Sequence, residues 1–145
     1  MHMPRKLYTA IFCLLLPLYF LRLFWKGLYN KEYLFRWPER LGISKNLPLK
    51  GKSLIWIHAV SVGEVNASMP LIRSLIEKYP DIEILVTTTT PTGSKLLMER
   101  LGNKIKHQYM PVDIPIFINF FLKKWKPKIL ILIETEIWPN IIFNC

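Results

Sequence analysis

Beyond residue 52 the chain carries four short runs of consecutive apolar residues. Runs of this length without strict alternation indicate strands whose two faces are both covered by other elements. The last run, KILILIE, is the most strongly apolar, and the third run is the weakest. The predicted strands are 53–59, 82–88, 106–110 and 128–134.

Segments with apolar residues three and four positions apart separate these runs and predict helices. The predicted helices are 65–79, 92–101 and 115–125. Pro70 is tolerated in the first of them only if it lies near the first turn. Strands and helices that alternate at this spacing predict right-handed βαβ units on a parallel sheet, so we expect an α/β domain of the Rossmann-like type.

The first third of the chain is dominated by an apolar run at 7–25, which contains a single charged residue, Arg22. A helix of this length would extend about 28 Å, close to the hydrocarbon thickness of a bilayer. Pro17 would kink it and Arg22 would reach toward the headgroups, so the segment either spans the membrane or lies partly embedded. A cleaved signal peptide is disfavoured because no small-residue cleavage site follows. We therefore expect an uncleaved membrane-anchor helix within 1–26.

The positive charge of the chain lies mainly in this first third. The net charge is +10; residues 1–52 hold ten basic against two acidic residues, whereas residues 53–145 hold ten against eight. A basic segment directly after an apolar stretch is typical of proteins beside an anionic membrane surface and argues against nucleic acid as the partner. We expect a basic juxtamembrane segment at 27–52 and the Rossmann-like domain at 53–145. The positive-inside rule places this domain in the cytoplasm.

Composition and motifs exclude several other classes of protein. Hydrophobic residues make up 51% and charged residues 21%, which is too apolar for a disordered chain. Cys13 and Cys145 are too few for a disulfide scaffold or a four-cysteine zinc module. The chain has no glycine-rich phosphate-binding motif and no metal-ligand spacing, so we expect neither a metal nor a cofactor. His58 is expected to pack within its strand.

The carboxyl ends of parallel strands meet at one edge of a sheet, where ligands bind in this class of fold. Glu64 follows Gly63 at the first strand-to-helix turn. Its carboxylate either caps the N-terminus of the helix or acts as a general base toward a substrate hydroxyl, and position alone leaves both open. Gly63 would let a ligand approach the backbone closely.

Glu134 and Glu136 follow the last predicted strand, and alternation places them on one side of the chain. Two nearby carboxylates raise each other's pKa, which suits proton handling or stabilisation of a developing cation; an ion pair with a lysine is the alternative. The threonines at 87–90 either offer hydroxyls to a sugar or phosphate or only reflect strand propensity. The candidate catalytic residues are Glu64 and Glu134, and the candidate substrate-binding residues are Ser61, Gly63, Thr90, Thr92, Glu136 and Trp138.

Several longer motifs resemble a known family. The motifs IHAVSVGEVNASMPLIRSL, ILVTTTTPTGSKL, YMPVDIP and ILIETEIWPN are together similar to the N-terminal half of bacterial 3-deoxy-D-manno-octulosonic acid (Kdo) transferases. The motif RWPERLG at 36–42 and the apolar segment before it also resemble that family. The resemblance implies a glycosyltransferase fold of the B type, built from two Rossmann-like halves of which this chain would carry the first.

The same resemblance implies a reaction. Members of the family transfer Kdo from CMP-Kdo to a lipid A precursor (lipid IVA) at the cytoplasmic face of the inner membrane, in lipopolysaccharide synthesis. The transfer inverts the anomeric centre and needs no catalytic metal. The glutamate of the SVGE motif, Glu64, would be the base, and the first glutamate of the ETE motif, Glu134, would assist the transition state. The N-terminal half would face the lipid acceptor.

The chain departs from the family pattern where it stops. Cys145 falls inside the helix expected after the fourth strand, and the second domain, which holds most of the contacts to CMP-Kdo in the family, does not follow. We therefore expect this chain by itself to lack most donor affinity and activity. The alternatives are a non-enzymatic, membrane-bound module that binds the acceptor and another lipid-sugar transferase of the same architecture.

Overall fold

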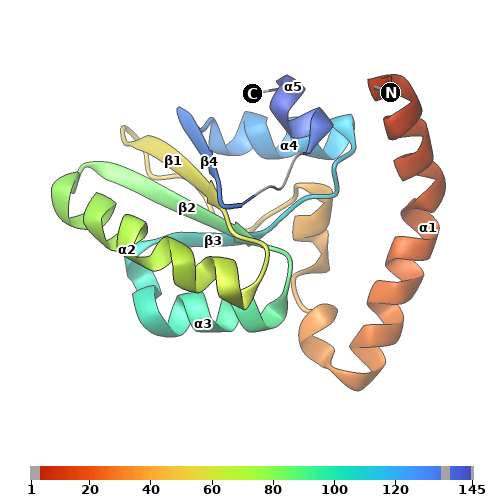
Figure 1. Cartoon of the computed structure of the whole chain (residues 1–145), viewed down its shortest axis with the longest axis horizontal. Helices are drawn as coiled ribbons and strands as arrows, with labels where there is room; N and C mark the ends of the chain where they lie inside the picture. Colours follow the sequence, from red (N-terminus) through yellow and green to blue (C-terminus); the bar gives the residue numbers. More distant parts are fainter. Residues whose placement is uncertain (1–3, 135–137, 145) are drawn as a thin grey trace.

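The computed structural model describes residues 4–134 and 138–144, and its centre is a parallel sheet of four strands (Figure 1). The strands lie in the order β3-β2-β1-β4, so the first strand lies in the interior of the sheet. At the carboxyl end of β1, His58 pairs with Thr87 on one side and Leu132 on the other. The strand bounds are β1 Ser53–His58, β2 Ile82–Thr88, β3 Lys106–Tyr109 and β4 Ile129–Leu132.

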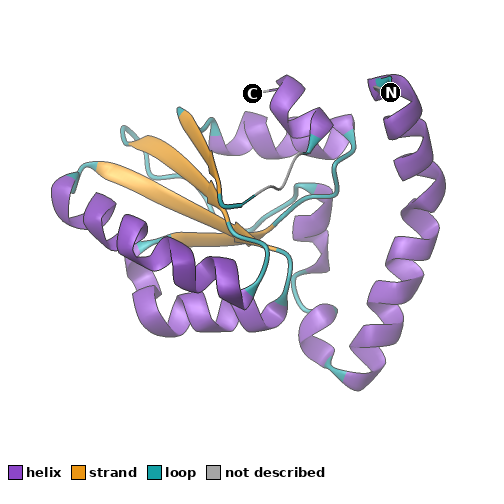
Figure 2. Cartoon of the chain, in the orientation of Figure 1, coloured by secondary structure: helices purple, strands orange, loops and turns teal. Residues whose placement is uncertain are grey.

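Helices cover both faces of this sheet, with α2 and α3 on one face and α4 and α5 on the other (Figures 1 and 2). Because side chains alternate along a strand, β1 contributes Ile55 and Ile57 to the core beside α2 and α3. It contributes Leu54 and Trp56 to the core beside α4 and α5. The predicted α/β architecture with a parallel sheet is thus confirmed. The helix bounds are α2 Val62–Lys78, α3 Pro91–Leu101, α4 Pro115–Trp125 and α5 Pro139–Asn144.

The helix α2 differs from the prediction in two respects. It begins at Val62, three residues earlier than expected, because Ser61 caps its N-terminus. Pro70 lies in the interior of the helix and not near the first turn, so that prediction was wrong. Pro70 and Asn66, whose carbonyl group loses its helical partner, are both exposed. The helical hydrogen bond that the proline cannot make is therefore lost on the exposed side of α2.

The apolar helix α1 runs from Arg5 to Tyr29, beyond both ends of the predicted run. Within the described residues it alone has the length and hydropathy needed to cross a membrane, which by itself is weak evidence for crossing. Pro17 lies inside α1 and the helix continues through it. Figure 1 shows α1 running alongside the α/β unit, on the side where the strands end.

The segment between α1 and β1 folds against the α/β unit and contains the short 3-10 helices Lys31–Tyr33 and Trp37–Leu41. Arg36 forms a bidentate ion pair with Glu39, with N–O distances of 2.6 and 2.9 Å. The Glu39 carboxylate also accepts a hydrogen bond from the backbone N–H of Tyr109 at 2.8 Å. These bonds attach the segment to β3, and the division of the chain at residues 26 and 52 stays a prediction.

Candidate functional site

Two loops lie side by side at the carboxyl edge of the sheet, one after β1 and one after β2. The backbone N–H of Thr89 donates to the carbonyl oxygen of Val60 at 3.3 Å, and the Thr89 hydroxyl donates to the same oxygen at 3.0 Å. Each loop ends in a helix cap. Ser61 caps α2, and Thr90 caps α3 by accepting from the N–H of Gly93 at 3.2 Å. Two capped helix N-termini, each the positive end of a helix dipole, are thus brought to one edge.

Glu64 lies in the first turn of α2, and its side chain is nearly buried. One carboxylate oxygen accepts from the backbone N–H of Val60 at 2.5 Å, and the other accepts from the Ser61 hydroxyl at 3.0 Å. The backbone N–H of Glu64 donates in return to the Ser61 oxygen at 3.5 Å. This arrangement is a variant of the capping box, because the carboxylate accepts from the backbone N–H of the residue before the cap and not from that of the cap itself. The carboxylate therefore stabilises the start of α2. A base at this position would be fixed in orientation by the bond from Val60.

Gly63 and Thr92, two further candidates, face open space beside these caps. A Cβ atom added at Gly63 would meet only the Ser61 hydroxyl oxygen, at 3.7 Å, so packing within the described chain does not require glycine here. Thr92 is exposed, and its hydroxyl donates to that of Thr90 at 3.5 Å. The surface next to both residues is therefore accessible to a ligand.

Three candidate residues follow β4, and the two that the structure describes differ in how far they are buried. Glu134 is exposed and has a φ of +63°, in the left-handed region that glutamate rarely adopts. Strained backbone of this kind is concentrated at functional sites. Glu136 lies outside the described residues. The partly buried ring of Trp138 stands edge-on to that of His58, with 6.3 Å between ring centres. Trp138 therefore lies beside the end of β1, and Glu134 follows the end of the neighbouring strand β4.

His58 is fully buried within β1, as expected. Its Nδ1 lies 2.9 Å from the hydroxyl oxygen of Thr87, while its Nε2 has no hydrogen-bond partner among residues 4–134 and 138–144. Burial lowers the pKa of His58 to about 4, against the opposing effects of the Thr87 backbone and the Glu64 carboxylate. The ring is therefore neutral at pH 7, which suits a packing role.

Sequence reasoning missed Arg40, which it placed in the juxtamembrane segment. The side chain is buried, and its two terminal nitrogens donate to the hydroxyl of Tyr19 at 3.0 Å and the carbonyl of Thr89 at 2.9 Å. Its guanidinium group also lies over the ring of Tyr109, 4.7 Å from the ring centre. Arg40 thus joins α1 to the loop after β2. The signal that could have found it is its place in the RWPERLG motif.

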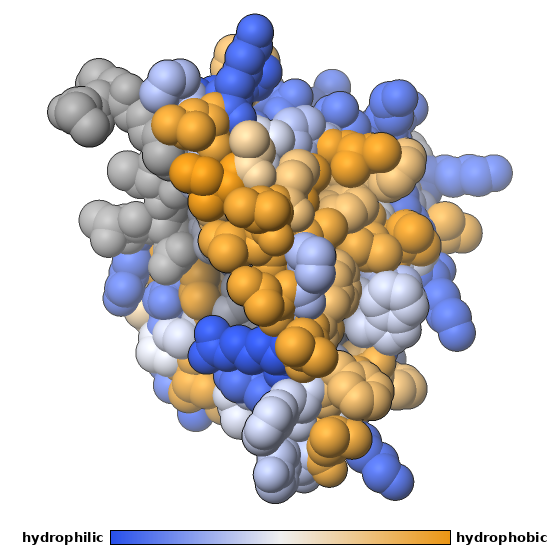
Figure 3. Space-filling model, turned by 90° about the vertical axis from the view of Figure 1, so that its right-hand side faces the viewer, coloured by the Kyte–Doolittle hydropathy of each residue, from blue (hydrophilic) through white to orange (hydrophobic). Residues whose placement is uncertain are grey.

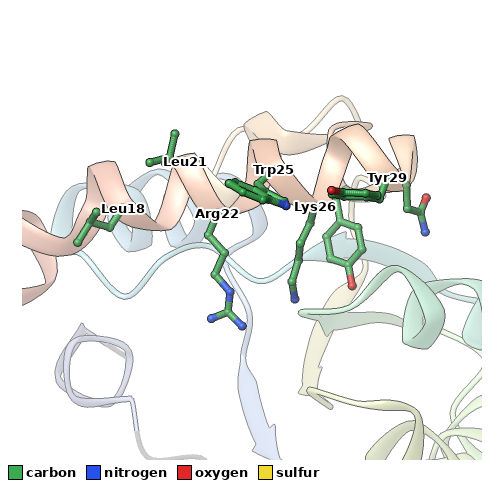
Figure 4. A pocket seen from close by; sticks show the side chains of 8 residues that line it. Leu18, Leu21, Arg22, Trp25, Lys26 and Tyr29 are labelled. Atoms are coloured by element: carbon green, nitrogen blue, oxygen red, sulfur yellow. The ribbon is translucent and has the colours of Figure 1, made fainter.

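Arg40 also lines a pocket of about 450 Å³ between α1 and the sheet edge. The pocket has a mainly apolar lining, and its charged residues are Arg22, Lys26, Arg40 and Asp113. The Asp113 carboxylate accepts from two backbone N–H groups of α5, so the three cations outweigh it on the walls. Figure 4 is drawn around a second, neighbouring pocket on α1, which shares Arg22 and Lys26 with this one. It shows these two side chains pointing from α1 toward the α/β unit, whereas Leu21 points to the other side of the helix. Apolar walls next to several cationic side chains suit a ligand that has both an apolar part and an anionic group. The apolar residues that line it include Phe12, Leu15, Leu16, Leu23, Met110 and Val112.

Known proteins similar to this chain are transferases. The family described as 3-Deoxy-D-manno-octulosonic-acid transferase (kdotransferase) matches residues 35–145. A probable mitochondrial 3-deoxy-D-manno-octulosonic acid transferase of Arabidopsis thaliana is 42% identical over 137 residues, 94% of this chain and 30% of that protein. The 3-deoxy-D-manno-octulosonic acid transferase of Haemophilus influenzae is 39% identical over 140 residues, 97% of this chain and 33% of that protein.

The 3-deoxy-D-manno-octulosonic acid transferase of Rickettsia bellii is 39% identical over 137 residues, which are 94% of this chain and 32% of that protein. The chain thus spans about a third of the length of these relatives, and the matched residues include the whole α/β unit. A match over 35–145 extends through both capped loops and Arg40. On this similarity, the chain belongs to the 3-deoxy-D-manno-octulosonic acid transferase family.

Proposed function

We propose that the protein to which this chain contributes transfers Kdo from CMP-Kdo to a lipid A precursor at the cytoplasmic face of the inner membrane. The observation that carries the proposal is the family match over 35–145, which includes Glu64 at the edge of the sheet. The pocket next to that edge has apolar walls and cationic side chains, which supports a phosphorylated lipid as the acceptor. We assign most contacts to CMP-Kdo to parts of the protein outside this chain.

Glu64 is the proposed general base. A sugar hydroxyl is a weak nucleophile, so a carboxylate within hydrogen-bonding reach has to take its proton as the anomeric carbon is attacked. The acceptor hydroxyl would replace that of Ser61 on one oxygen of Glu64, while the N–H of Val60 keeps its bond to the other. The strained, exposed Glu134 follows the strand next to β1, where its charge would stabilise an oxocarbenium-like transition state.

The remaining candidates would contact the substrate around this pair of carboxylates. Ser61 and Thr90 offer hydroxyl groups at the two caps, and the open surface at Gly63 gives room for the sugar. Trp138 lines the pocket next to α1. The proposed substrate-binding residues are therefore Ser61, Gly63, Thr90, Thr92, Glu136 and Trp138.

The test compares Glu64→Gln with Ser61→Ala in the full-length protein. Glutamine keeps an oxygen that accepts from Val60 but cannot take a proton, so we expect transfer to slow by about a hundredfold to ten-thousandfold. Alanine at 61 removes a hydroxyl that caps α2 and that we propose contacts the substrate, but it leaves the base. We therefore expect about 1 kcal/mol of destabilisation, with a loss of rate that is real but much smaller than that of Glu64→Gln. The readouts are transfer of Kdo from CMP-Kdo to the lipid acceptor, acceptor binding, and urea unfolding.

Near-normal transfer by the Glu64→Gln variant would remove Glu64 from the role of base. Equal losses of rate in the two variants, each in proportion to its loss of stability, would leave Glu64 as a helix cap only. Acceptor binding that persists while no variant or wild-type preparation transfers Kdo would instead favour a membrane-bound acceptor-binding module.

A further inference from the structure

A chain of polar groups leads from the segment before β1 to the loop between β2 and α3. At its centre lies His107 of β3, which is only 3% exposed. Its Nδ1 lies 3.0 Å from a terminal nitrogen of Arg36, and its Nε2 lies 2.9 Å from the hydroxyl oxygen of buried Thr88. The Thr88 hydroxyl in turn donates to the backbone carbonyl oxygen of Thr90 at 3.4 Å. Arg36 is thus connected through two buried side chains to the residue that caps α3.

The neighbours of His107 determine which ring nitrogen carries the proton. Burial and the nearby guanidinium groups of Arg36 and Arg40 lower the pKa of His107 to about 3, so the ring is neutral at pH 7. A guanidinium nitrogen only donates, so its 3.0 Å contact with Nδ1 is attractive only when Nδ1 has no proton. The hydroxyl of Ser94, 3.3 Å away, can donate to the same nitrogen. The hydrogen-bond network therefore assigns the proton to Nε2.

This tautomer decides the direction of the next hydrogen bonds. With the proton on Nε2, the hydroxyl of Thr88 accepts from His107 and keeps its own proton for the carbonyl oxygen of Thr90. With the proton on Nδ1, the same hydroxyl would have to donate to Nε2, and the carbonyl of Thr90 would lose this donor. The proton position on β3 therefore determines whether the turn before α3 is held.

Arg36 and Arg40 both belong to the motif RWPERLG, and both act on this loop. Arg40 donates to the backbone carbonyl oxygen of Thr89 at 2.9 Å. Arg36 is itself fixed by its bidentate ion pair with Glu39 and by a bond of 2.9 Å to the carbonyl oxygen of His107. Three successive residues of the loop are therefore held, directly or through His107, from one motif.

The helix α1 covers Arg40 from one side of the molecule. Near the start of α1, Thr9 exchanges hydrogen bonds with the side chain of Asn140 in α5 at 3.2 and 3.1 Å, and farther along Tyr19 accepts from Arg40 at 3.0 Å. Figure 3, which views the molecule from the side on which α1 lies, shows apolar surface running along most of its height. Hydrogen bonds enclosed in this way are stronger than those in water, so the network should keep one geometry.

The loop held by this network packs against the loop that precedes Glu64. A Cβ atom added at Gly93 would lie 3.0 Å from the Thr90 hydroxyl oxygen, and 3.7 Å from both the Cβ atom of Thr88 and the carbonyl carbon of Ser61. These groups from the two loops thus enclose the same small space. Movement of Thr88 would therefore be felt at Ser61, whose hydroxyl donates to Glu64 at 3.0 Å.

We propose that His107 is a positioning residue of the acceptor site: fixed by Arg36 as the Nε2–H tautomer, it holds Thr88 and thereby the cap at Thr90. The proposal rests on the proposed function for the role of Thr90 in binding the acceptor, whereas the tautomer does not depend on it. Groups at such a site have to be held within about 0.5 Å, and a misplacement of about 1 Å can cost a hundredfold in rate. Thr89 and Thr90 are only partly buried, so their loop needs support from outside.

The first test observes the tautomer and needs no activity. Nitrogen NMR of the full-length protein, prepared with ¹⁵N-labelled histidine, separates protonated from unprotonated ring nitrogens. The signals of residue 107 are those missing from the His107→Gln variant. We expect a protonated Nε2 and an unprotonated Nδ1 at pH 7. The opposite tautomer, or a charged ring, would overturn the proposal.

The second test compares two amide replacements that differ by one methylene group. In His107→Gln the amide lies near the former Nε2 and can still donate to Thr88. In His107→Asn it lies near the former Nδ1, where it can accept from Arg36 but cannot reach Thr88. We expect His107→Asn to lower kcat/KM for the lipid acceptor about tenfold to a hundredfold, and His107→Gln to stay within about threefold. The KM for CMP-Kdo should be unchanged in both.

A double variant tests whether the effect passes through Thr88. Thr88→Val removes the hydroxyl and should lower kcat/KM for the acceptor as His107→Asn does, whereas Thr88→Ser keeps the hydroxyl and should not. In the presence of Thr88→Val, the change His107→Asn should cost nothing further. Fully additive losses would show that His107 acts by another route and would overturn the proposal.

Gly51→Ala separates positioning from a simple loss of stability. Gly51 precedes β1 at the opposite edge of the sheet and has a φ of +81°, so alanine there should lower the urea midpoint and leave the kinetics unchanged. Losses of kcat/KM in both His107 variants, each in proportion to its urea midpoint, would mean a structural role only. If the wild-type protein transfers no Kdo, the proposed function fails, and the tautomer and the binding of the lipid acceptor to the same variants decide this proposal.

Discussion

Gly42 ends the 3-10 helix Trp37–Leu41 and allows that segment to lie directly against α4. Its φ is +78°, in the left-handed region that side chains disfavour. A Cβ atom at this position would fall on the backbone carbonyl oxygen of Phe117, closer than any ordinary contact, and 3.2 Å from the Cβ atom of Phe120. Substitution by alanine therefore carries both a conformational and a steric cost.

Gly51 provides a matched control, because substitution there carries the conformational cost of a positive φ without the steric cost. Its φ is +81°, and a Cβ atom added there would have nothing within 4 Å. The left-handed conformation costs an ordinary residue about 1–2 kcal/mol, so we expect that loss for Gly51→Ala. Overpacking adds about 1–3 kcal/mol, so we expect Gly42→Ala to lose about 2–5 kcal/mol in all.

Urea unfolding of the two variants, followed by the fluorescence of the buried Trp56 and Trp125, measures this difference. Both variants should shift the midpoint without changing the slope, since neither alters the surface exposed on unfolding. If Gly42→Ala and Gly51→Ala agree to within about 0.5 kcal/mol, the close approach between residue 42 and α4 does not exist. The placement of Arg40 two residues earlier would then need another explanation.

Two further predictions concern groups at or near the sheet edge. Burial lowers the pKa of His58 to about 4 and, together with Arg36 and Arg40, that of His107 to about 3. The unfolded chain binds protons at its histidines near pH 6.5, whereas the folded chain does not, so stability should fall as the pH drops from about 6.5 toward 4. NMR titration should show both rings neutral down to about pH 5. Thr90→Ala should lose about 1 kcal/mol in urea unfolding through loss of the α3 cap, whereas Thr92→Ala, at an exposed site, should stay within about 0.5 kcal/mol.

The strands were predictable because burial on both faces demands runs of apolar residues. The prediction 82–88 coincides with β2, while β4 is shorter than predicted and ends at Leu132. The position of Pro70 inside α2 was harder to predict. A proline is tolerated within a helix where the carbonyl group that it leaves unpaired is exposed to solvent, and the spacing of apolar residues did not show that this part of α2 is exposed. The start of α2 was recoverable in principle, since Ser61 and Glu64 have the spacing of a capping box.

The surroundings of the candidate site were only partly predictable. Glu64, Thr90 and their loops follow strands, so the topology alone brings them to one edge. Arg40 could not be placed in this way, because its partners are 21 and 49 residues away along the chain. The polar side of α1 was hidden for the same reason: Tyr19 gains its role only from contact with a distant guanidinium group.

The bond between Thr9 and Asn140 has a consequence for the order of events during synthesis. The two residues are 131 positions apart. At about 5–20 residues per second, a ribosome needs roughly 7–26 s to reach the second residue after making the first. During that interval the end of α1 can already contact the segment that follows it, because Tyr19 and Arg40 are only 21 positions apart. The start of α1 can take its final position only after α5 has been made, so the two ends of this one helix are fixed at different stages of synthesis.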